Sequence, residues 1–310
     1  MSKTFRSAAF VGLIVLLSGA TIGALVQRAA EGSFEKTLNV SGSVDVDVST
    51  GSGTIEVQPG APDRVTIHAI VRVGEWRRSH SEAEELLRGL VNNPPIEQVG
   101  SVIRIGRNDD PKLRQDVAIS YQITVPKETR LHALTGSGNQ TIEGITGPAD
   151  VQTGSGSIHL REVKTGVRSK TGSGSIIAEN TGGGFEGHTG SGSVHFIQAT
   201  PGDVEITTGS GSVEAAAVKG ALSIHTGSGS VRAEGQPTGS WNLDTGSGSV
   251  KLGLPQIGFN LNAHTGSGGI TVNHPLIVQG TIRKNELIGT VRGGGIPIQI
   301  RTGSGSIRVE

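Results

Sequence analysis

The chain of 310 residues contains no cysteine, and aromatic residues make up only 3% of it. The first absence excludes disulfides, thiolate metal sites and a cysteine nucleophile. The second means that a hydrophobic core has to be built from valine, isoleucine, leucine and alanine. The chain also lacks an excess of charge, with 27 basic and 27 acidic residues. This balance argues against a nucleic-acid-binding protein and against a protein that binds membrane surfaces through basic residues.

What the sequence has in abundance is one short motif, Thr-Gly-Ser-Gly. The motif occurs ten times, beginning at Thr50, Thr135, Thr153, Thr171, Thr189, Thr208, Thr226, Thr245, Thr265 and Thr302. Between Thr135 and Thr265 it returns every 18 to 20 residues, and the last copy follows 37 residues later. A fixed period of this length predicts a solenoid, in which each repeat forms one coil stacked on the next.

Apolar and polar residues alternate on both sides of the motif. Around Thr153, Ala149 and Val151 come before the threonine, and Ile158 and Leu160 come after it. Such alternation predicts two short strands per coil, each with one face inward, and glycine permits the sharp reversal between them. We expect the inward threonine to hydrogen-bond a neighbouring coil. A flexible Gly/Ser linker would not keep apolar residues in register, so the predicted fold is all-β, a parallel β-solenoid of about ten coils over residues 135–310.

Residues 1–30 form either a signal peptide or a transmembrane anchor. Ala8 to Val26 run without a charge, after Lys3 and Arg6. As an anchor, this stretch is just long enough to span a bilayer with its positive end inside. As a signal peptide, it offers a cleavage site near Ala20. We favour the anchor, and with either alternative the rest of the chain is exported to the cell envelope.

Two segments break the repeat. Residues 31–134 predict a β-rich cap with one helix at about 81–92, where Ser81 and Glu84 fit a capping box. Residues 273–296 predict a hairpin that covers the final edge of the solenoid. On this interpretation Arg308 and Glu310 lie on the strand that ends the stack.

Several features follow one another in an order that is known from a protein family. They are the uncharged N-terminal stretch, the Thr50–Val57 corner, the cap helix, the strand Ser120–Pro126, the run of Thr-Gly-Ser-Gly-Ser-Val/Ile coils, and the closing Gly-Gly-Gly-x-Pro-x-x-x-Arg-Thr-Gly-Ser-Gly-Ser-Ile. From about Phe34 to Glu310 the chain resembles the bacterial putative-adhesin family of DUF-type β-strand-repeat domains. The resemblance implies a single-pass or secreted envelope protein with a β-solenoid, no established activity, and no catalytic or binding residues to carry over.

Acidic residues in the coils are sparse, and the alignment of the repeats places no two of them in one column on neighbouring coils. A polysaccharide-active β-helix enzyme, which needs clustered acids, is therefore disfavoured. Calcium-binding β-rolls are disfavoured too, because their turn aspartates are serines here. One column remains, in which His225, Asp244 and His264 point outward on consecutive coils. This column is a candidate transition-metal site, and the alternative is a solvated polar column without a ligand. No cofactor is implied.

Trp76, Arg77 and Arg78 form a second candidate, a ligand contact in a loop of the cap. Sugar binding by stacking needs exposed aromatic rings, and Phe185, Phe196 and Trp241 fall on inward positions. The alternative is that Trp76 packs on its own helix.

The predicted function is a non-enzymatic envelope or surface scaffold, an adhesin whose partner is an envelope polymer, a surface protein or a glycan. Two alternatives stay open: a structural subunit that stacks end to end, and an accessory protein of an envelope-stress system.

Overall fold

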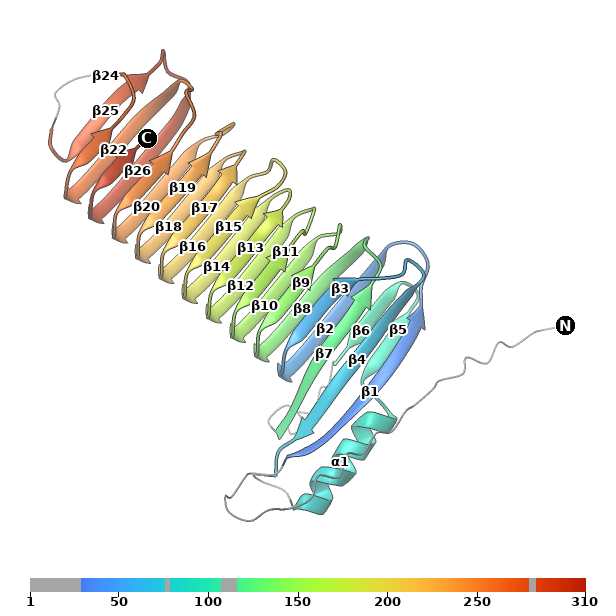
Figure 1. Ribbon diagram of the computed structural model, residues 1–310. Helices are drawn as coiled ribbons and strands as arrows, with labels where there is room; N and C mark the ends of the chain where they lie inside the picture. The colour runs from blue at the N-terminus through green and yellow to red at the C-terminus, as the bar shows by residue number, and fades with distance from the viewer. Residues whose placement is uncertain (1–28, 76–78, 107–115, 279–282) are drawn as a thin grey trace.

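A computed structural model describes residues 29–75, 79–106, 116–278 and 283–310. Two large sheets face each other, sheet A with 13 strands and sheet B with 14. Figure 1 shows a long rod with a helix at one end, the proximal end, and a hairpin at the other, the distal end. The predicted all-β parallel solenoid is confirmed.

Each coil gives one strand to each sheet because apolar residues alternate on both sides of the Thr-Gly-Ser-Gly corner. Around Thr153, β10 (Ala149–Ser155) lies in sheet B and β11 (Ile158–Arg161) in sheet A, and their inward residues are buried. The other regular strands of sheet B are β8 (Thr129–Ser137), β12 (Val167–Ser173), β14 (Phe185–Ser191), β16 (Val204–Ser210), β18 (Leu222–Ser228) and β20 (Trp241–Ser247). Their partners in sheet A are β9 (Gln140–Glu143), β13 (Ile176–Thr181), β15 (Val194–Gln198), β17 (Val213–Val218), β19 (Val231–Gly235) and β21 (Val250–Gly253).

The corners are joined by a ladder of threonine hydroxyls, as the sequence predicts. Thr171 Oγ1 donates to the carbonyl oxygen of Gly156 in the neighbouring coil at 2.8 Å. The same bond recurs in every coil from Thr135 onward, at 2.8 to 3.1 Å. Gly156 has φ of 147°, and a Cβ there would lie 2.1 Å from the carbonyl oxygen of Gly138. Only glycine therefore lets the corners approach this closely.

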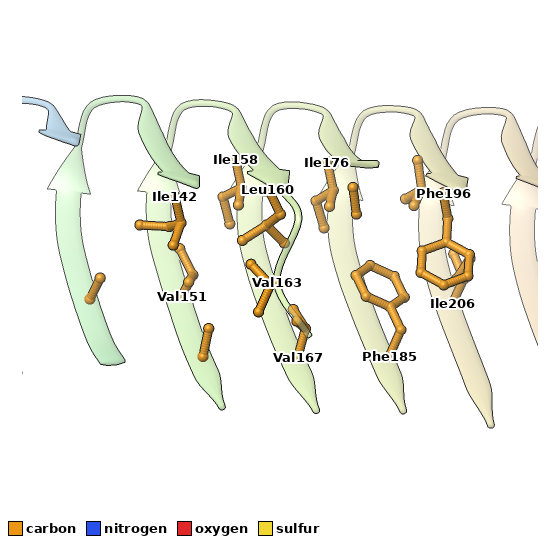
Figure 2. Packing of buried hydrophobic residues seen from close by; sticks show 14 of the residues in the cluster. Ile142, Val151, Ile158, Leu160, Val163, Val167, Ile176, Phe185, Phe196 and Ile206 are labelled. Atoms are coloured by element: carbon orange, nitrogen blue, oxygen red, sulfur yellow. The ribbon is translucent and has the colours of Figure 1, made fainter. Parts of the chain in front are cut away.

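Large side chains in the core lie beside small ones. Phe185 stacks on Phe196 with ring centroids 4.4 Å apart (Figure 2). A Cβ on the neighbouring Gly187 would lie 2.7 Å from the Phe185 ring. Trp241 is fully buried, and its Nε1 donates to the carbonyl oxygen of Gly220 at 3.0 Å. The predicted inward positions of the three aromatic residues are confirmed.

The last coil in the sequence is not the last coil of the stack. β26 (Ile296–Ser304) lies between β20 and β22 (Phe259–Ser267) and pairs in parallel with both. In sheet A, β27 (Ile307–Val309) likewise lies between β21 and β23 (Ile270–Val272). The C-terminal coil is thus inserted between the two coils that precede it. The prediction that Arg308 and Glu310 lie on the terminal edge is therefore wrong.

A hairpin covers the distal edge of sheet B, as predicted. β25 (Glu286–Val291) pairs antiparallel with β22, and β24 (Leu276–Val278) pairs antiparallel with β25. Sheet A receives no such cover among the described residues, and its order ends at β23.

The proximal end begins with a coil that is distant in sequence. β2 (Val44–Ser52) and β3 (Ile55–Pro59) form the coil of Thr50, which stacks in register on the coil of Thr135. Beyond it, sheet A continues with β7 (Val117–Val125), β4 (Arg64–Val73) and β1 (Ala30–Asn39), and sheet B with β6 (Val102–Ile105) and β5 (Ile96–Val99).

The predicted helix of the cap is α1 (His80–Asn92), which packs against β1 and β4. Its capping box is formed by Ser79 and Glu82, not by Ser81 and Glu84. Because the helix begins at His80, the capping position falls two residues earlier than predicted. Glu82 Oε2 accepts a hydrogen bond from the Ser79 backbone nitrogen at 2.7 Å.

None of the helices in the described ranges is long and apolar enough to cross a membrane. The predicted anchor or signal peptide, Ala8–Val26, lies outside the described residues.

Candidate functional site

The outer face of sheet B carries two straight columns of side chains, because all coils share one register at the threonine. One column is the residue immediately before each threonine, and the other is the residue three positions before it. In spatial order, the first column reads Leu134, Gln152, Lys170, His188, Thr207, His225, Asp244, Arg301 and His264. The second reads His132, Asp150, Arg168, Glu186, Glu205, Ser223, Asn242, Gln299 and Asn262.

The predicted metal column is not continuous. His225 and Asp244 are neighbours, with His225 Nδ1 3.8 Å from Asp244 Oδ2. Arg301 of the inserted coil separates Asp244 from His264. A guanidinium at that place repels a cation. Within the described part of the chain, no three His, Asp or Glu side chains are close enough to hold a metal ion. The proposed set fails because chain order and spatial order differ at the distal end.

The second candidate, Trp76, Arg77 and Arg78, lies outside the described residues. The described residues on either side of it are joined, since His80 Nδ1 lies 2.7 Å from Glu75 Oε1. The ligand contact proposed for this loop stays a prediction.

A groove of about 800 Å³ runs along the side of the rod on which the sheet-B strands begin. Its lining residues come from the first positions of seven neighbouring strands, β8 to β20, and from the turn residues just before them. Six spacings of ~4.8 Å give the groove a length of roughly 29 Å. The groove was not predicted from the sequence, although the column three residues before each threonine, which supplies most of its polar side chains, can be read from the repeat alignment.

The proximal half of the groove carries charges that compensate one another. Arg168 Nη2 lies 2.7 Å from Glu186 Oε2, and His188 Nε2 lies 2.9 Å from Glu186 Oε1. The hydrogen bond with His188 and then the charge of Arg168 hold the pKa of the Glu186 carboxyl below its usual range. One coil closer to the proximal end, His132 Nδ1 lies 3.6 Å from Asp150 Oδ2.

The distal half of the groove is acidic and then uncharged. Glu205 is exposed, and Asp203 Oδ1 accepts a hydrogen bond from the Ala221 backbone nitrogen at 2.9 Å. Beyond these carboxylates the lining consists of Ser223, Ser240 and Asn242. This half offers hydrogen-bond donors and acceptors to a hydrophilic ligand.

Two acidic residues do share a column on neighbouring coils, which corrects the sequence analysis. Glu186 of β14 lies directly opposite Glu205 of β16. The alignment of the repeats already places both residues three positions before a threonine, so the pair could have been found from the sequence.

Aromatic stacking is not available in the groove. Every phenylalanine, tyrosine and tryptophan in the described part of the chain is buried. A ligand in this groove is therefore held by hydrogen bonds and charges and not by ring faces.

The outer face of sheet A differs from the groove in being a network of ion pairs. Glu214 pairs with His195 at 3.2 Å and with Arg232 at 3.8 Å. Arg232 Nη2 also lies 2.6 Å from Glu234 Oε1, and these carboxylates raise the pKa of Arg232. Because these charged side chains pair with one another, the outer face of sheet A leaves fewer unpaired polar groups for a ligand.

A family model described as Toastrack DUF4097 matches residues 117–310, from the start of β7 to the end of the chain. This is well over half of the sequence. The chain belongs to the Toastrack DUF4097 family. The resemblance noted in the sequence is thereby confirmed, although the matched Toastrack region begins at residue 117 and not near Phe34. No curated protein matches the chain.

Three solved structures of bacterial proteins align with most of this chain. A protein of Clostridium sporogenes, named a putative cell adhesion protein, is 15% identical, with a TM-score of 0.29 over 89% of this chain and 98% of that one. Named putative adhesins of Parabacteroides distasonis and Bacteroides fragilis are 10% and 11% identical, with TM-scores of 0.34 and 0.29, each over 90% of this chain and 97% of the other.

Proposed function

We propose that this Toastrack protein is a non-enzymatic, adhesin-like scaffold of the cell envelope that binds an extended polysaccharide along the sheet-B groove. The observation that carries the proposal is the shape of the groove, which repeats one set of polar positions over seven parallel strands. A polymer of similar units, each about as long as the ~4.8 Å spacing of the strands, can meet an equivalent position in every coil.

The charges of the groove favour a particular kind of polysaccharide. The carboxylates of Asp203 and Glu205 suit an amino group, and Ser223, Ser240 and Asn242 suit hydroxyl groups. Arg168 and Glu186 already satisfy each other at 2.7 Å, so the proximal half adds polar contacts without a large net charge. We therefore expect a hydrophilic glycan in which some of the sugars carry amino groups.

Glu186 does not have the character of a glycosidase acid. Such an enzyme needs one of its two acids to be protonated at working pH, which requires a raised pKa. The pKa of Glu186 is shifted the other way by His188 and Arg168. This direction suits a carboxylate that binds a ligand better than one that donates a proton.

A tether through Ala8–Val26 is part of the proposal, with cleavage near Ala20 as the alternative. Expression with the native N-terminus in a bacterial host, followed by fractionation and intact-mass measurement, decides between them. We expect the full-length mass in the membrane fraction. A soluble exported chain that begins near Thr21 would instead indicate release, and a full-length chain in the cytosol would contradict export.

The binding proposal is tested with soluble glycan oligomers of increasing length, using calorimetry on the full chain in detergent. We expect affinity to rise with oligomer length up to about six sugars, which matches six strand spacings of ~4.8 Å, and then to level off. Oligomers with free amino groups are expected to bind more tightly than their acetylated forms. Binding that is equally strong for a single sugar would contradict a groove site.

A matched pair of variants locates the site. Ser223→Tyr places a large side chain in the groove on β18, and Thr141→Tyr places the same side chain on the outer face of sheet A, on β9. We expect Ser223→Tyr to weaken binding at least about tenfold and Thr141→Tyr to leave it unchanged. Equal loss in both variants, or no glycan binding by the wild type, would overturn the proposal.

A further inference from the structure

The two sheets end at different heights at the distal end. β22 and β23 belong to one coil and are the last coil strands of sheets B and A. Sheet B then continues with β25 and β24, whereas within the described ranges sheet A stops at β23. Sheet B therefore overhangs sheet A by two strands, and Figure 1 shows this hairpin at the end of the rod.

The overhang leaves apolar side chains partly uncovered. Ile307 and Val309, one coil inside the stack, are 1% and 0% exposed. Ile270 and Val272 occupy the same columns in β23 and are only half-buried. On the hairpin, Ile277 is 70% exposed. Among the described residues, nothing covers this end in the way that each inner coil is covered by the next.

The free edges at the two ends of the rod differ in charge. β23 reads Ile-Thr-Val and β24 reads Leu-Ile-Val, so neither contains a charged residue. At the proximal end, β1 contains Glu31, Glu35 and Lys36, and α1 packs against it. Charged residues and covering helices are the usual protection of a sheet edge against pairing with another chain. At the proximal end, β1 of sheet A has this protection and β5 of sheet B has the charge of Glu97, whereas the distal edge strands have neither.

We propose that the distal end is a self-association surface, at which two copies join around a two-fold axis with β24 of each copy beside β23 of the other. The overhang of one copy fills the two-strand gap of its partner, so the interface is self-complementary, as an isologous dimer requires. An apolar end then meets an identical apolar end, and the charged proximal end stays outside the contact.

The strand directions agree with this arrangement. β24 is parallel to β22, since each of them is antiparallel to β25. β23 runs opposite to β22 because the Thr-Gly-Ser-Gly corner reverses the chain between them. A two-fold rotation about an axis along the strands places the partner's β24 in the plane of sheet A, antiparallel to β23. The two short edges can then exchange backbone hydrogen bonds, as in β-strand addition.

Such a dimer would be weak, because each edge strand has only three residues. Small interfaces typically belong to transient complexes, and we expect a dissociation constant on the order of micromolar. The proposed function places a membrane tether at the proximal end. If that tether is correct, the dimer joins two membranes through rods of roughly 58 Å each, which is the span of twelve strand spacings. Glycan binding in the groove does not require the dimer, so the two proposals can fail separately.

The test is sedimentation equilibrium of the full chain in density-matched detergent, with two double variants that differ in one side chain. An in-phase antiparallel pairing places Thr271 of β23 opposite Ile277 of the partner's β24, with both side chains outward. Thr271→Lys with Ile277→Lys then creates two like-charged cross-strand pairs, and Thr271→Lys with Ile277→Glu creates two opposite-charged pairs. We expect the second variant to dimerise at least about fivefold more tightly than the first.

Two single variants serve as controls for exposed apolar residues elsewhere. Leu134 on the side of the rod is 43% exposed, and Val99 on the proximal edge strand β5 is 66% exposed. We expect Leu134→Lys and Val99→Lys to leave the dissociation constant unchanged, and Ile277→Lys to raise it at least about tenfold. A wild type that stays monomeric at high concentration overturns the proposal. Equal affinity of the two double variants overturns the strand pairing, and a loss in Val99→Lys would indicate head-to-tail stacking instead.

Discussion

The coils in the middle of the rod and the coils at its ends use the same repeat but follow different rules of assembly. From β8 to β21, each coil stacks on the one that precedes it in the sequence. At the ends, the coil of Thr50 stacks on that of Thr135, and the C-terminal coil inserts between two earlier ones. The Thr-Gly-Ser-Gly corner therefore specifies register and does not specify the position of a coil in the stack.

Position is set outside the motif. The turn from β21 to β22 is no longer than the turn from β11 to β12, so turn length alone does not place a coil in the stack. The step from Thr245 to Thr265 is 20 residues, the longest of the regular run, because β22 begins further ahead of its threonine than β20 does. The hairpin of β24 and β25 then returns the chain to the vacant place that β26 and β27 fill.

Engineered disulfides test the inserted coil directly, and they carry the largest expected effect. The chain has no native cysteine, so Asp244→Cys with Arg301→Cys forms a bond without competitors. The Cα atoms of residues 244 and 301 lie on neighbouring strands, ~4.8 Å apart, which is within the Cα–Cα range of a disulfide. In the control pair, Asp244→Cys with His264→Cys, the Cα atoms are two strand spacings apart and outside that range. The first pair closes a long loop, and we expect it to raise the free energy of unfolding by ~4 kcal/mol.

The readout is thiol titration and thermal unfolding, with and without reductant. If the second pair oxidises readily and the first does not, then the coils stack in chain order and the insertion is wrong. A single Arg301→Cys variant controls for the loss of the guanidinium.

Glycines at the corner should tolerate substitution in different degrees. A Cβ at Gly156 would meet the Gly138 carbonyl oxygen at 2.1 Å, whereas a Cβ at Gly269 of the terminal coil, which takes the place that Ser157 holds in the coil of Gly156, has no atom within 4 Å. We expect Gly156→Ala to lower the free energy of unfolding by about 3 kcal/mol. Gly269→Ala should change it by less than about 0.5 kcal/mol.

Urea unfolding followed by circular dichroism measures both variants. A small effect at Gly156 would mean that the stack adjusts to a side chain at the corner, and the tight approach of the corners would not be essential.

Much of this fold could be predicted from the sequence, because each copy of the motif fixes how its coil aligns with the neighbouring coils. The inward columns, the threonine ladder and the all-β class follow from alternation around a fixed corner, and the structure confirms them. The capping box was misplaced by two residues because Ser79 and Ser81 both precede a glutamate at the right spacing. Local pattern alone does not choose between two overlapping matches.

The site was harder to predict because it depends on which coils are neighbours. His225 and Asp244 are adjacent, as predicted, but Arg301 enters between Asp244 and His264 from a coil far along the chain. Repeats of identical register give no sequence signal for such an insertion. The groove, by contrast, combines a column that the alignment contains with a surface shape that only the three-dimensional stack creates.

The threonine ladder should contribute more in the middle of the rod than at its proximal end. Thr171 is 3% exposed, and its hydroxyl satisfies the Gly156 carbonyl at 2.8 Å. Thr50 is half-buried and bonds Ile119 at 3.0 Å. We expect Thr171→Val to cost ~1–2 kcal/mol of unfolding free energy, because a part-buried acceptor loses its partner. Thr50→Val should cost less than half of that, since water can replace the hydroxyl. Chemical denaturation checks both values, and equal costs would mean that the ladder is uniform along the rod.

The smallest expected effect concerns pH and a middle coil. Hydrogen bonding with His188, and then Arg168, lowers the pKa of Glu186 in the folded chain. A carboxyl whose pKa is lower in the folded chain binds a proton more readily when the chain is unfolded. Its contribution to stability is therefore fully present above the pKa of the unfolded chain, ~4.3. That contribution is lost as the pH falls through the pKa of the folded chain. We therefore expect the difference in unfolding free energy between the wild type and Glu186→Gln to be constant from pH 7 to about 5 and to shrink below that. Because the Glu186 side chain is 33% exposed, the difference at pH 7 should not exceed about 1 kcal/mol.

Denaturation curves from pH 7 to 3 give this profile, and His188→Ala, which removes the first cause of the pKa shift, should flatten most of it. A difference that grows as pH falls would show that the carboxylate destabilises its coil, and the charge pattern of the groove would then be explained by ligand binding alone.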